Sequence, residues 1–142
     1  MILLDTNVLS ECMRPDPSAR VMAWLDAQAA GQLWVCAISR AEIELGIALL
    51  VDGRRKHALR TAAEAMFAED FGGRCLSFDA VAASRYAALV SSRMRLGRPI
   101  SVEDAQIAAI ALAHGMTLAT RHTRDFEAIE GLLVVDPWQT AA

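Results

Sequence analysis

Four acidic residues, far apart in the chain, lie where predicted strands end or predicted helices begin. Asp5 directly follows the first apolar run, and Asp125 lies five residues beyond the end of the fourth. Glu42 and Asp104 each lie in the first turn of a predicted helix. Ligands of open α/β sheets bind beyond the carboxyl ends of the strands, where four such carboxylates can share one edge. We therefore treat these four acids as candidate catalytic residues.

The chemistry that such a cluster favours is metal-dependent hydrolysis. Carboxylates held close together repel one another, and a divalent cation compensates their charge. Mg²⁺ and Mn²⁺ prefer oxygen ligands, polarise a phosphodiester and lower the pKa of a bound water. In-line attack then gives a 5′-phosphate or 3′-hydroxyl product. No Ser–His–acid or Cys–His arrangement competes, since His57, His114 and His122 lie at predicted helix edges and in loops.

Each acid also has a purely structural interpretation. Glu42 and Asp104 both follow a serine by three residues at a predicted helix start, which is the pattern of a capping box. Asp5 is equally suited to capping the short helix after it, and Asp125 is typical of an exposed loop. The residue pattern by itself leaves both interpretations open.

The composition excludes several classes of protein. A chain of 142 residues with 54% apolar and 22% charged residues is long enough for one core and too apolar to be disordered. We expect one domain over residues 1–142. A net charge of −3 is not that of a duplex-binding protein, so any contact with nucleic acid is expected to be local. The apolar runs are too short to span a bilayer, and no basic segment precedes the first, so we expect a cytoplasmic protein.

Other ligand-binding classes lack their motifs here. Cys12, Cys36 and Cys75 are too far apart for a zinc site and odd in number, so we expect reduced thiols. No G-x-G-x-x-G follows the first strand, which excludes a dinucleotide fold. An aspartyl-phosphatase motif requires an acid in place of Asn7 and a threonine in place of Leu9, and this sequence has neither.

Short apolar strands alternate with helices along the chain. Strands are predicted at residues 2–4, 33–36, 74–76, 117–120 and 132–135. Helices are predicted at residues 6–13 and 57–71, from Ser77 or Asp79 to residue 96, and from Ser101 to residue 113. Two further helices are predicted to begin at Ser18 and at Ser39. This alternation predicts an α/β fold with a mostly parallel sheet of about five strands, covered on both faces.

Two basic groups interrupt this pattern, formed by Arg54, Arg55 and Lys56 and by Arg93, Arg95 and Arg98. Each is either a solvated face or a set of phosphate contacts along single-stranded or looped RNA. The sequence does not decide between the two.

Four segments together carry a family resemblance. They read LLDTNVLS (residues 3–10), SRAEIELG (39–46), DAQIAA (104–109) and ATRHTRDF (119–126). In this order and spacing they resemble the four motifs of PIN-domain ribonucleases, in particular the VapC/FitB-type toxins of type II toxin–antitoxin systems. The resemblance covers essentially the whole chain.

The resemblance implies a PIN-like α/β/α sandwich and a Mg²⁺- or Mn²⁺-dependent endoribonuclease that hydrolyses RNA phosphodiester bonds. Asp5, Glu42 and Asp104 match the acidic triad of the family. By this match Asp5 and Asp104 are expected to bind the metal, and Glu42 to bind it or to orient the attacking water.

Five further residues match site-lining or substrate-contacting positions: Thr6, Asn7, Thr120, Arg121 and His122. Thr6 and Asn7 would brace the first acid, or cap the helix. His122 departs from the family pattern, which often has an acid or asparagine there. Asp125 is the candidate to replace that fourth acid, and His122 is then either a phosphate contact or an exposed loop residue.

The resemblance also implies partners. These are a cognate antitoxin protein that inserts a peptide into the acidic cleft, an RNA substrate, and a second copy of the chain in a homodimer or higher assembly. DNA would be bound only through the antitoxin, and no membrane is involved. The competing hypothesis is a catalytically inert PIN-fold interaction module that acts in an antitoxin–repressor complex.

Overall fold

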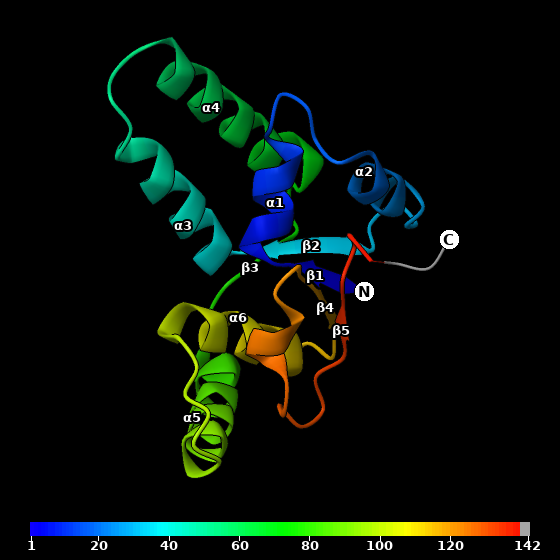
Figure 1. Cartoon of the computed structure of the whole chain (residues 1–142), viewed down its shortest axis with the longest axis vertical. Helices are drawn as coiled ribbons and strands as arrows, with labels where there is room; N and C mark the ends of the chain where they lie inside the picture. The colour runs from blue at the N-terminus through cyan, green and yellow to red at the C-terminus, as the bar shows by residue number, and fades with distance from the viewer. Residues whose placement is uncertain (140–142) are drawn as a thin grey trace.

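A five-stranded parallel sheet forms the centre of the molecule in this computed structural model, which describes residues 1–139. The strands are β1 (Ile2–Leu4), β2 (Leu33–Cys36), β3 (Cys75–Leu76), β4 (Thr117–Ala119) and β5 (Val134–Val135). Their order is β3-β2-β1-β4-β5, and every pair is parallel (Figure 1). The predicted α/β class and parallel sheet are confirmed.

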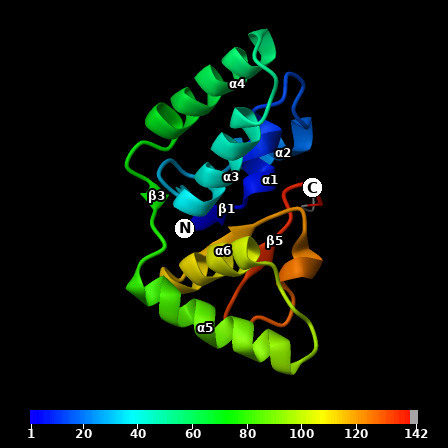
Figure 2. The ribbon, with the colours of Figure 1, turned by 90° about the vertical axis from the view of Figure 1, so that its left-hand side faces the viewer.

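Six α-helices within residues 1–139 cover the two faces of this sheet. They are α1 (Thr6–Cys12), α2 (Ala19–Asp26), α3 (Ala37–Ala48), α4 (Arg54–Ala65), α5 (Ala80–Arg95) and α6 (Val102–Ala113). Figure 2 shows helices α1 to α4 on one side of the sheet and α5 and α6 on the other. A π-helical turn, η1 (Met66–Asp70), extends α4, and a 3₁₀ turn, η2 (Thr123–Phe126), follows β4. Within residues 1–139, no helix has both the length and the apolar composition needed to cross a membrane.

Two apolar cores result from the alternation of side chains along the strands. Leu3 and Leu118 point to the core under α5 and α6, whereas Leu4 and Ala119 point to the core under α1 to α4. All four are fully buried. Helix α6 is buried almost all round, because the run from Ile107 to Ala111 has no exposure. The apolar strands are therefore fixed on both faces, and so are the residues at their ends.

The predicted helix starts are confirmed where a side chain caps the helix and wrong where one does not. Ser18, Asp79 and Ser101 each accept a hydrogen bond from the backbone N–H three residues on. Ser39 does not cap α3: that helix begins at Ala37, and Ser39 lies buried within its first turns. Helix α4 begins at Arg54 rather than residue 57, with Lys56 reaching back to the Ala48 carbonyl.

The three cysteines are free. Cys36 is buried and the other two are half-buried, as expected for small apolar side chains. Burial raises the pKa of the Cys12 thiol to about 11, with the Glu11 charge adding to the effect.

A buried carboxylate, Glu11, ties the end of α1 to the start of α2. Its side chain is 5% exposed and accepts hydrogen bonds from the Ser18 backbone N–H at 2.8 Å and from Arg14 Nη1 at 3.2 Å. The hydrogen bond from Ser18, helped by Arg14, lowers the pKa of Glu11 below its ordinary value of 4.5.

Replacing Glu11 by glutamine is expected to lower the free energy of unfolding by about 1 kcal/mol at pH 7, because a charge-assisted hydrogen bond becomes a neutral one. A carboxylate whose pKa is lower in the folded chain stabilises fully above its ordinary pKa, and this contribution is lost as the pH falls through the lowered value. The difference between wild type and Glu11→Gln in urea unfolding should therefore vanish in acid. Glu64→Gln, at an exposed position of α4, is the control. A difference that persists in acid would contradict this account.

Candidate active site

Asp5 lies at the carboxyl end of β1, between β2 and β4, and is almost completely buried. Its Oδ1 accepts a hydrogen bond from the Thr6 backbone N–H at 2.8 Å. Its Oδ2 accepts from Asn7 Nδ2 at 2.9 Å and from Thr120 Oγ1 at 2.7 Å. Three donors therefore compensate the burial of this carboxylate and fix its orientation. Asn7 contacts Asp5 through its side chain and Thr6 only through its backbone N–H, and their bracing roles stay a prediction.

Glu42, on α3, is held by a chain of side chains that leads back to β2. Thr6 Oγ1 lies 2.8 Å from Glu42 Oε1 and 2.9 Å from Ser39 Oγ. A hydroxyl has one proton and a carboxylate only accepts, so Thr6 donates to Glu42 and accepts from Ser39. The thiol of Cys36 in turn donates to Ser39, with a sulfur–oxygen distance of 3.7 Å. Sequence reasoning missed this role of Ser39, since nothing in its motif distinguishes a buried hydroxyl from a helix cap.

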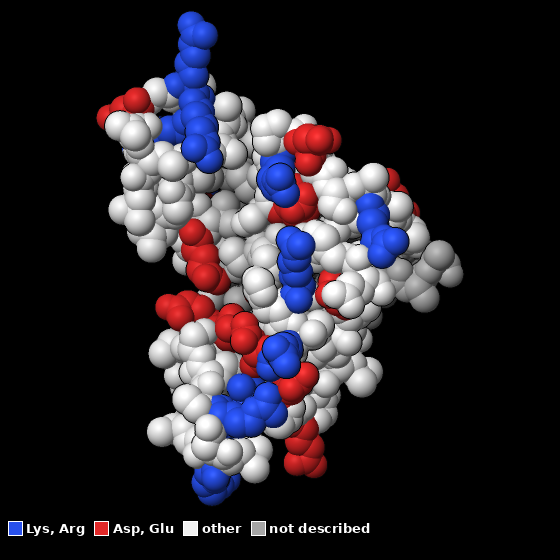
Figure 3. Space-filling model, viewed as in Figure 1, with Lys and Arg blue, Asp and Glu red and all other residues white. Residues whose placement is uncertain are grey.

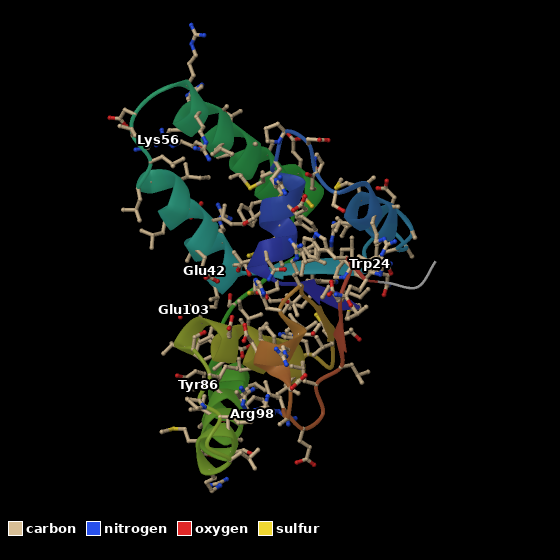
Figure 4. The ribbon with its side chains drawn as sticks, in the orientation of Figure 1. Trp24, Glu42, Lys56, Tyr86, Arg98 and Glu103 are labelled. Atoms are coloured by element: carbon tan, nitrogen blue, oxygen red, sulfur yellow. The ribbon has the colours of Figure 1, made fainter. Side chains whose placement is uncertain are left out.

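Asp104 lies half-buried in the first turn of α6, where its backbone N–H donates to Ser101 Oγ at 3.2 Å. Its neighbour Glu103 lies close to Glu42 across the gap between α6 and α3 (Figure 4). Glu103 was not among the predicted site residues, although its position in the same helical turn was a usable signal.

The acids influence one another electrostatically. Burial, and then the charges of Asp5 and Glu103, raise the pKa of Glu42. Burial, and then the charge of Asp5, raise the pKa of Asp104, with smaller effects from Asp125 and Glu42. The neighbouring charges make these carboxylates harder to ionise. A bound cation would stabilise their charged form.

One cavity of about 590 Å³ brings most of the predicted residues together. It is lined by Asp5, Thr6, Asn7, Ser10, Glu11, Arg14, Glu42, Asp104, Arg121, His122 and Trp138. Thr120 lies buried behind Asp5, and Asp125 is exposed on η2 outside the lining. Figure 3 shows acidic and basic side chains along the middle of this face. Four of the lining residues, Ser10, Glu11, Arg14 and Trp138, were not predicted as site residues from the sequence.

Arg121 and His122 reach the cavity from the loop after β4. The Arg121 backbone N–H donates to Asn7 Oδ1 at 3.0 Å, and the His122 N–H donates to Thr120 Oγ1 at 3.1 Å. The Arg121 guanidinium carbon lies 5.0 Å from the centre of the Trp138 ring. The loop is thus attached to the same residues that hold Asp5.

Neither interpretation of Arg93, a solvated face or a phosphate contact, agrees with the structure. This side chain is 4% exposed and donates to the backbone carbonyls of Arg98 at 2.8 Å, Asp125 at 3.0 Å and Glu127 at 2.9 Å. It attaches the 3₁₀ turn η2 to the end of α5. A buried guanidinium satisfied by carbonyls has no distinct sequence pattern.

The donor chemistry of the cavity fits a hard divalent cation. Asp5, Glu42 and Asp104 present carboxylate oxygens, to which Mg²⁺ and Mn²⁺ bind. Within residues 1–139, no three His, Cys, Asp or Glu side chains are grouped closely enough to surround an ion. Asp5 and Glu42 instead accept hydrogen bonds from Thr6, Asn7 and Thr120.

Comparison with known proteins gives the family. The model of the PIN domain matches residues 2–132, which is most of the chain. This chain belongs to the PIN-domain family. The family that the sequence resemblance suggested is therefore confirmed.

Two curated PIN-domain relatives extend over nearly the whole chain. Toxin FitB of Neisseria gonorrhoeae is 44% identical over 138 residues, covering 97% of this chain and 99% of FitB. VapC ribonuclease Y4jK of Sinorhizobium fredii is 40% identical over 141 residues, covering 99% and 100%. The chain is thus a PIN-domain toxin of the VapC/FitB type, from a type II toxin–antitoxin system.

The fold is shared with a solved PIN-domain complex. The structure of FitAB bound to an IR36 DNA fragment matches with a TM-score of 0.91 and 43% sequence identity, covering 100% of this chain and 99% of that chain. The PIN-like sandwich expected from the sequence is confirmed.

Thr120→Val is expected to lower the free energy of unfolding of this PIN domain by about 1–3 kcal/mol, because it removes a donor from the buried Asp5 carboxylate at nearly constant volume. Thr117→Val, on the same strand, is the matched control, since its hydroxyl makes no hydrogen bond within the described residues. Urea unfolding measures both. Equal stability of the two variants would show that Thr120 does not support Asp5.

Proposed function

We propose that this chain is a toxin that acts as a Mg²⁺- or Mn²⁺-dependent endoribonuclease and hydrolyses RNA phosphodiester bonds. The observation that carries the proposal is the cavity that Asp5, Glu42 and Asp104 line together. The raised pKa values of Glu42 and Asp104, to which the charge of Asp5 contributes, support it. Relatives of similar length named as a toxin and as a ribonuclease support it.

Each acid has a role in this proposal. Asp5 and Asp104 would hold the cation, and Glu42 would hold it or orient the attacking water. When bound, the cation polarises the phosphodiester and lowers the pKa of water. The chain supplies the orientation: Asn7 and Thr120 fix Asp5, while Ser39 acts through Thr6 to aim Glu42. Fixed carboxylates reduce the reorganisation needed when substrate binds.

Purified, partner-free chain is expected to cleave total cellular RNA with Mg²⁺ or Mn²⁺. Cleavage should fall by on the order of 10²-fold or more in Asp5→Asn and in EDTA. The substitution removes a ligand of the cation and EDTA removes the cation, so that the charge of the scissile phosphate is no longer compensated. Asp16→Asn, an exposed acid outside the cavity, should cleave like wild type. Gel electrophoresis of the RNA and mapping of fragment ends measure the effect.

The competing hypothesis, an inert PIN-fold module, gives the opposite result. A folded chain, shown to be free of antitoxin, would neither cleave RNA nor bind Mg²⁺ or Mn²⁺ in calorimetry. It would also be harmless when expressed without its partner. That combination would overturn the proposed enzyme.

We propose a secondary catalytic role for Asp125, as the acid that replaces the one missing at His122. Asp125 lies outside the cavity lining, but its charge reaches Asp104. Asp125→Ala is expected to reduce metal-dependent cleavage by about tenfold, less than Asp5→Asn, as for residues that support metal ligands indirectly. Glu130→Gln, also exposed, is the control. Unchanged cleavage and metal affinity would remove Asp125 from the site.

We further propose that a cognate antitoxin docks beside the acids. An adjoining cavity of about 630 Å³ shares Thr6, Ser10, Arg14 and Glu42 with the first. Its apolar lining comes from Met13, Ile43, Ile47, Leu50 and Leu59. An antitoxin helix in this groove could place an arginine against Glu42, in the strong geometry of a guanidinium–carboxylate pair.

The remaining parts of the proposal concern the assembly. Residues 1–142 would form one domain, acting in the cytoplasm where RNA is the substrate, as a homodimer or a larger complex with the antitoxin. DNA would be contacted through the antitoxin, as befits a toxin with a net charge of −3. The FitAB complex, which includes DNA, supports this arrangement by similarity.

A further inference from the structure

The cavity contains two side chains that the hydrolytic roles leave unused. Arg121 and Trp138 line it together with the acids. They come from different segments of the chain: Arg121 follows β4, and Trp138 follows β5, which is the next strand in the sheet. Their contact, with the guanidinium carbon 5.0 Å from the ring centre, therefore joins two neighbouring strand ends at the edge of the site.

Hydrogen bonds hold the Trp138 backbone, and its side chain is half-buried. Its backbone N–H donates to Asp136 Oδ1 at 2.8 Å, and Arg20 Nη1 donates to its carbonyl at 3.1 Å. Pro137, just before it, is fully buried. The ring itself is half-buried, packing on the core below α1 to α4 while it borders the cavity. An aromatic face fixed in this way loses little conformational entropy when a flat group stacks against it.

No carboxylate pairs with the Arg121 guanidinium among the described residues, and its contact is with the Trp138 ring. The Arg121 side chain is exposed. Arg14, the other arginine of the cavity, differs because it pairs with the buried Glu11 at 3.2 Å. The backbone of Arg121 is anchored on Asn7, which also holds Asp5. The backbone from which this guanidinium extends is thus tied to Asp5 through a single shared side chain, that of Asn7.

We infer that Arg121 and Trp138 form a subsite for one nucleotide of single-stranded RNA, next to the bond that is cut. Arg121 takes the phosphate through its N–H groups, and the flat guanidinium–indole pair receives an unpaired base. Arginine and tryptophan planes are the surfaces on which proteins stack unpaired bases, and a base within a duplex does not expose its face. The inference rests on the proposed ribonuclease function and assigns its substrate class.

The test measures RNA binding separately from cleavage. Anisotropy of labelled oligouridine is recorded in EDTA, which stops metal-dependent hydrolysis, at several salt concentrations. Arg121→Gln is expected to weaken binding about tenfold and to reduce the slope of log affinity against log salt by about 0.7, the value for one phosphate contact on a single strand. Trp138→Ala should weaken binding about tenfold and leave the slope unchanged.

Three comparisons make the test specific. Arg85→Gln, an exposed arginine on α5 outside this cavity, should bind like wild type. Trp138→Phe keeps an aromatic face and should retain most of the affinity. If Trp138→Ala does not fold, Arg121→Gln still tests the subsite, because the Arg121 side chain is exposed. The oligouridine paired with oligoadenine should bind all variants with one weak affinity.

The outcomes separate this inference from the proposed function. If Arg121→Gln and a folded Trp138→Ala bind single-stranded RNA like Arg85→Gln, while wild type still cleaves RNA, the subsite is wrong and the ribonuclease stands. If wild type neither binds nor cleaves RNA, both fail. If the variants keep RNA binding but no longer co-purify with co-expressed antitoxin, the pair belongs to the protein partner and the inference is overturned.

Discussion

The burial of the Asp5 carboxylate at the end of the central strand is the constraint on which the rest of the site depends. A carboxylate with 4% exposure is tolerated only with donors around it, and each donor here comes from a different position of the fold. The Thr6 N–H comes from the start of α1, Asn7 from the next position of that helix, and Thr120 from the end of β4. The same residues then position others, since Thr6 reaches Glu42 and Asn7 reaches the Arg121 backbone.

The cavity contains two different groups of side chains, the acids and the pair of Arg121 and Trp138. Glu42 and Asp104 approach Asp5 from the N-terminal halves of α3 and α6, and the neighbouring charges add to the rise in their pKa values that burial causes. The cation of the proposed function would relieve this repulsion between the carboxylates. Arg121 and Trp138 add a cation and an aromatic face to the same cavity. Together they match the two needs of a phosphodiester substrate, compensation of charge at the scissile group and a hold on the adjoining nucleotide.

Most of the fold was predictable from local sequence, and the site only in part. The short apolar strands and the caps Ser18, Asp79 and Ser101 were predictable, because apolar runs and side-chain caps act within a few residues. The triad, Thr6, Asn7, Arg121 and His122 were found through motif order, and the cavity contains them all. Ser39 and Arg93 were misjudged because their partners, Thr6 and the carbonyls of Asp125 and Glu127, are distant in sequence. Trp138 was missed as a site residue for the same reason.

The sheet register explains why such distant residues meet. Leu4 pairs with Ala119, and Ala119 pairs with Val135, so β1, β4 and β5 end at the same level. The next residues along each strand, Asp5, Thr120 and Asp136, are therefore neighbours in a row, and the segments after them must leave the sheet at one edge. A parallel sheet thereby delivers the beginning, the last third and the end of the chain to one cavity. Arg121 and Trp138 lie beside the acids because of that register, and any shift of β5 against β4 would separate them.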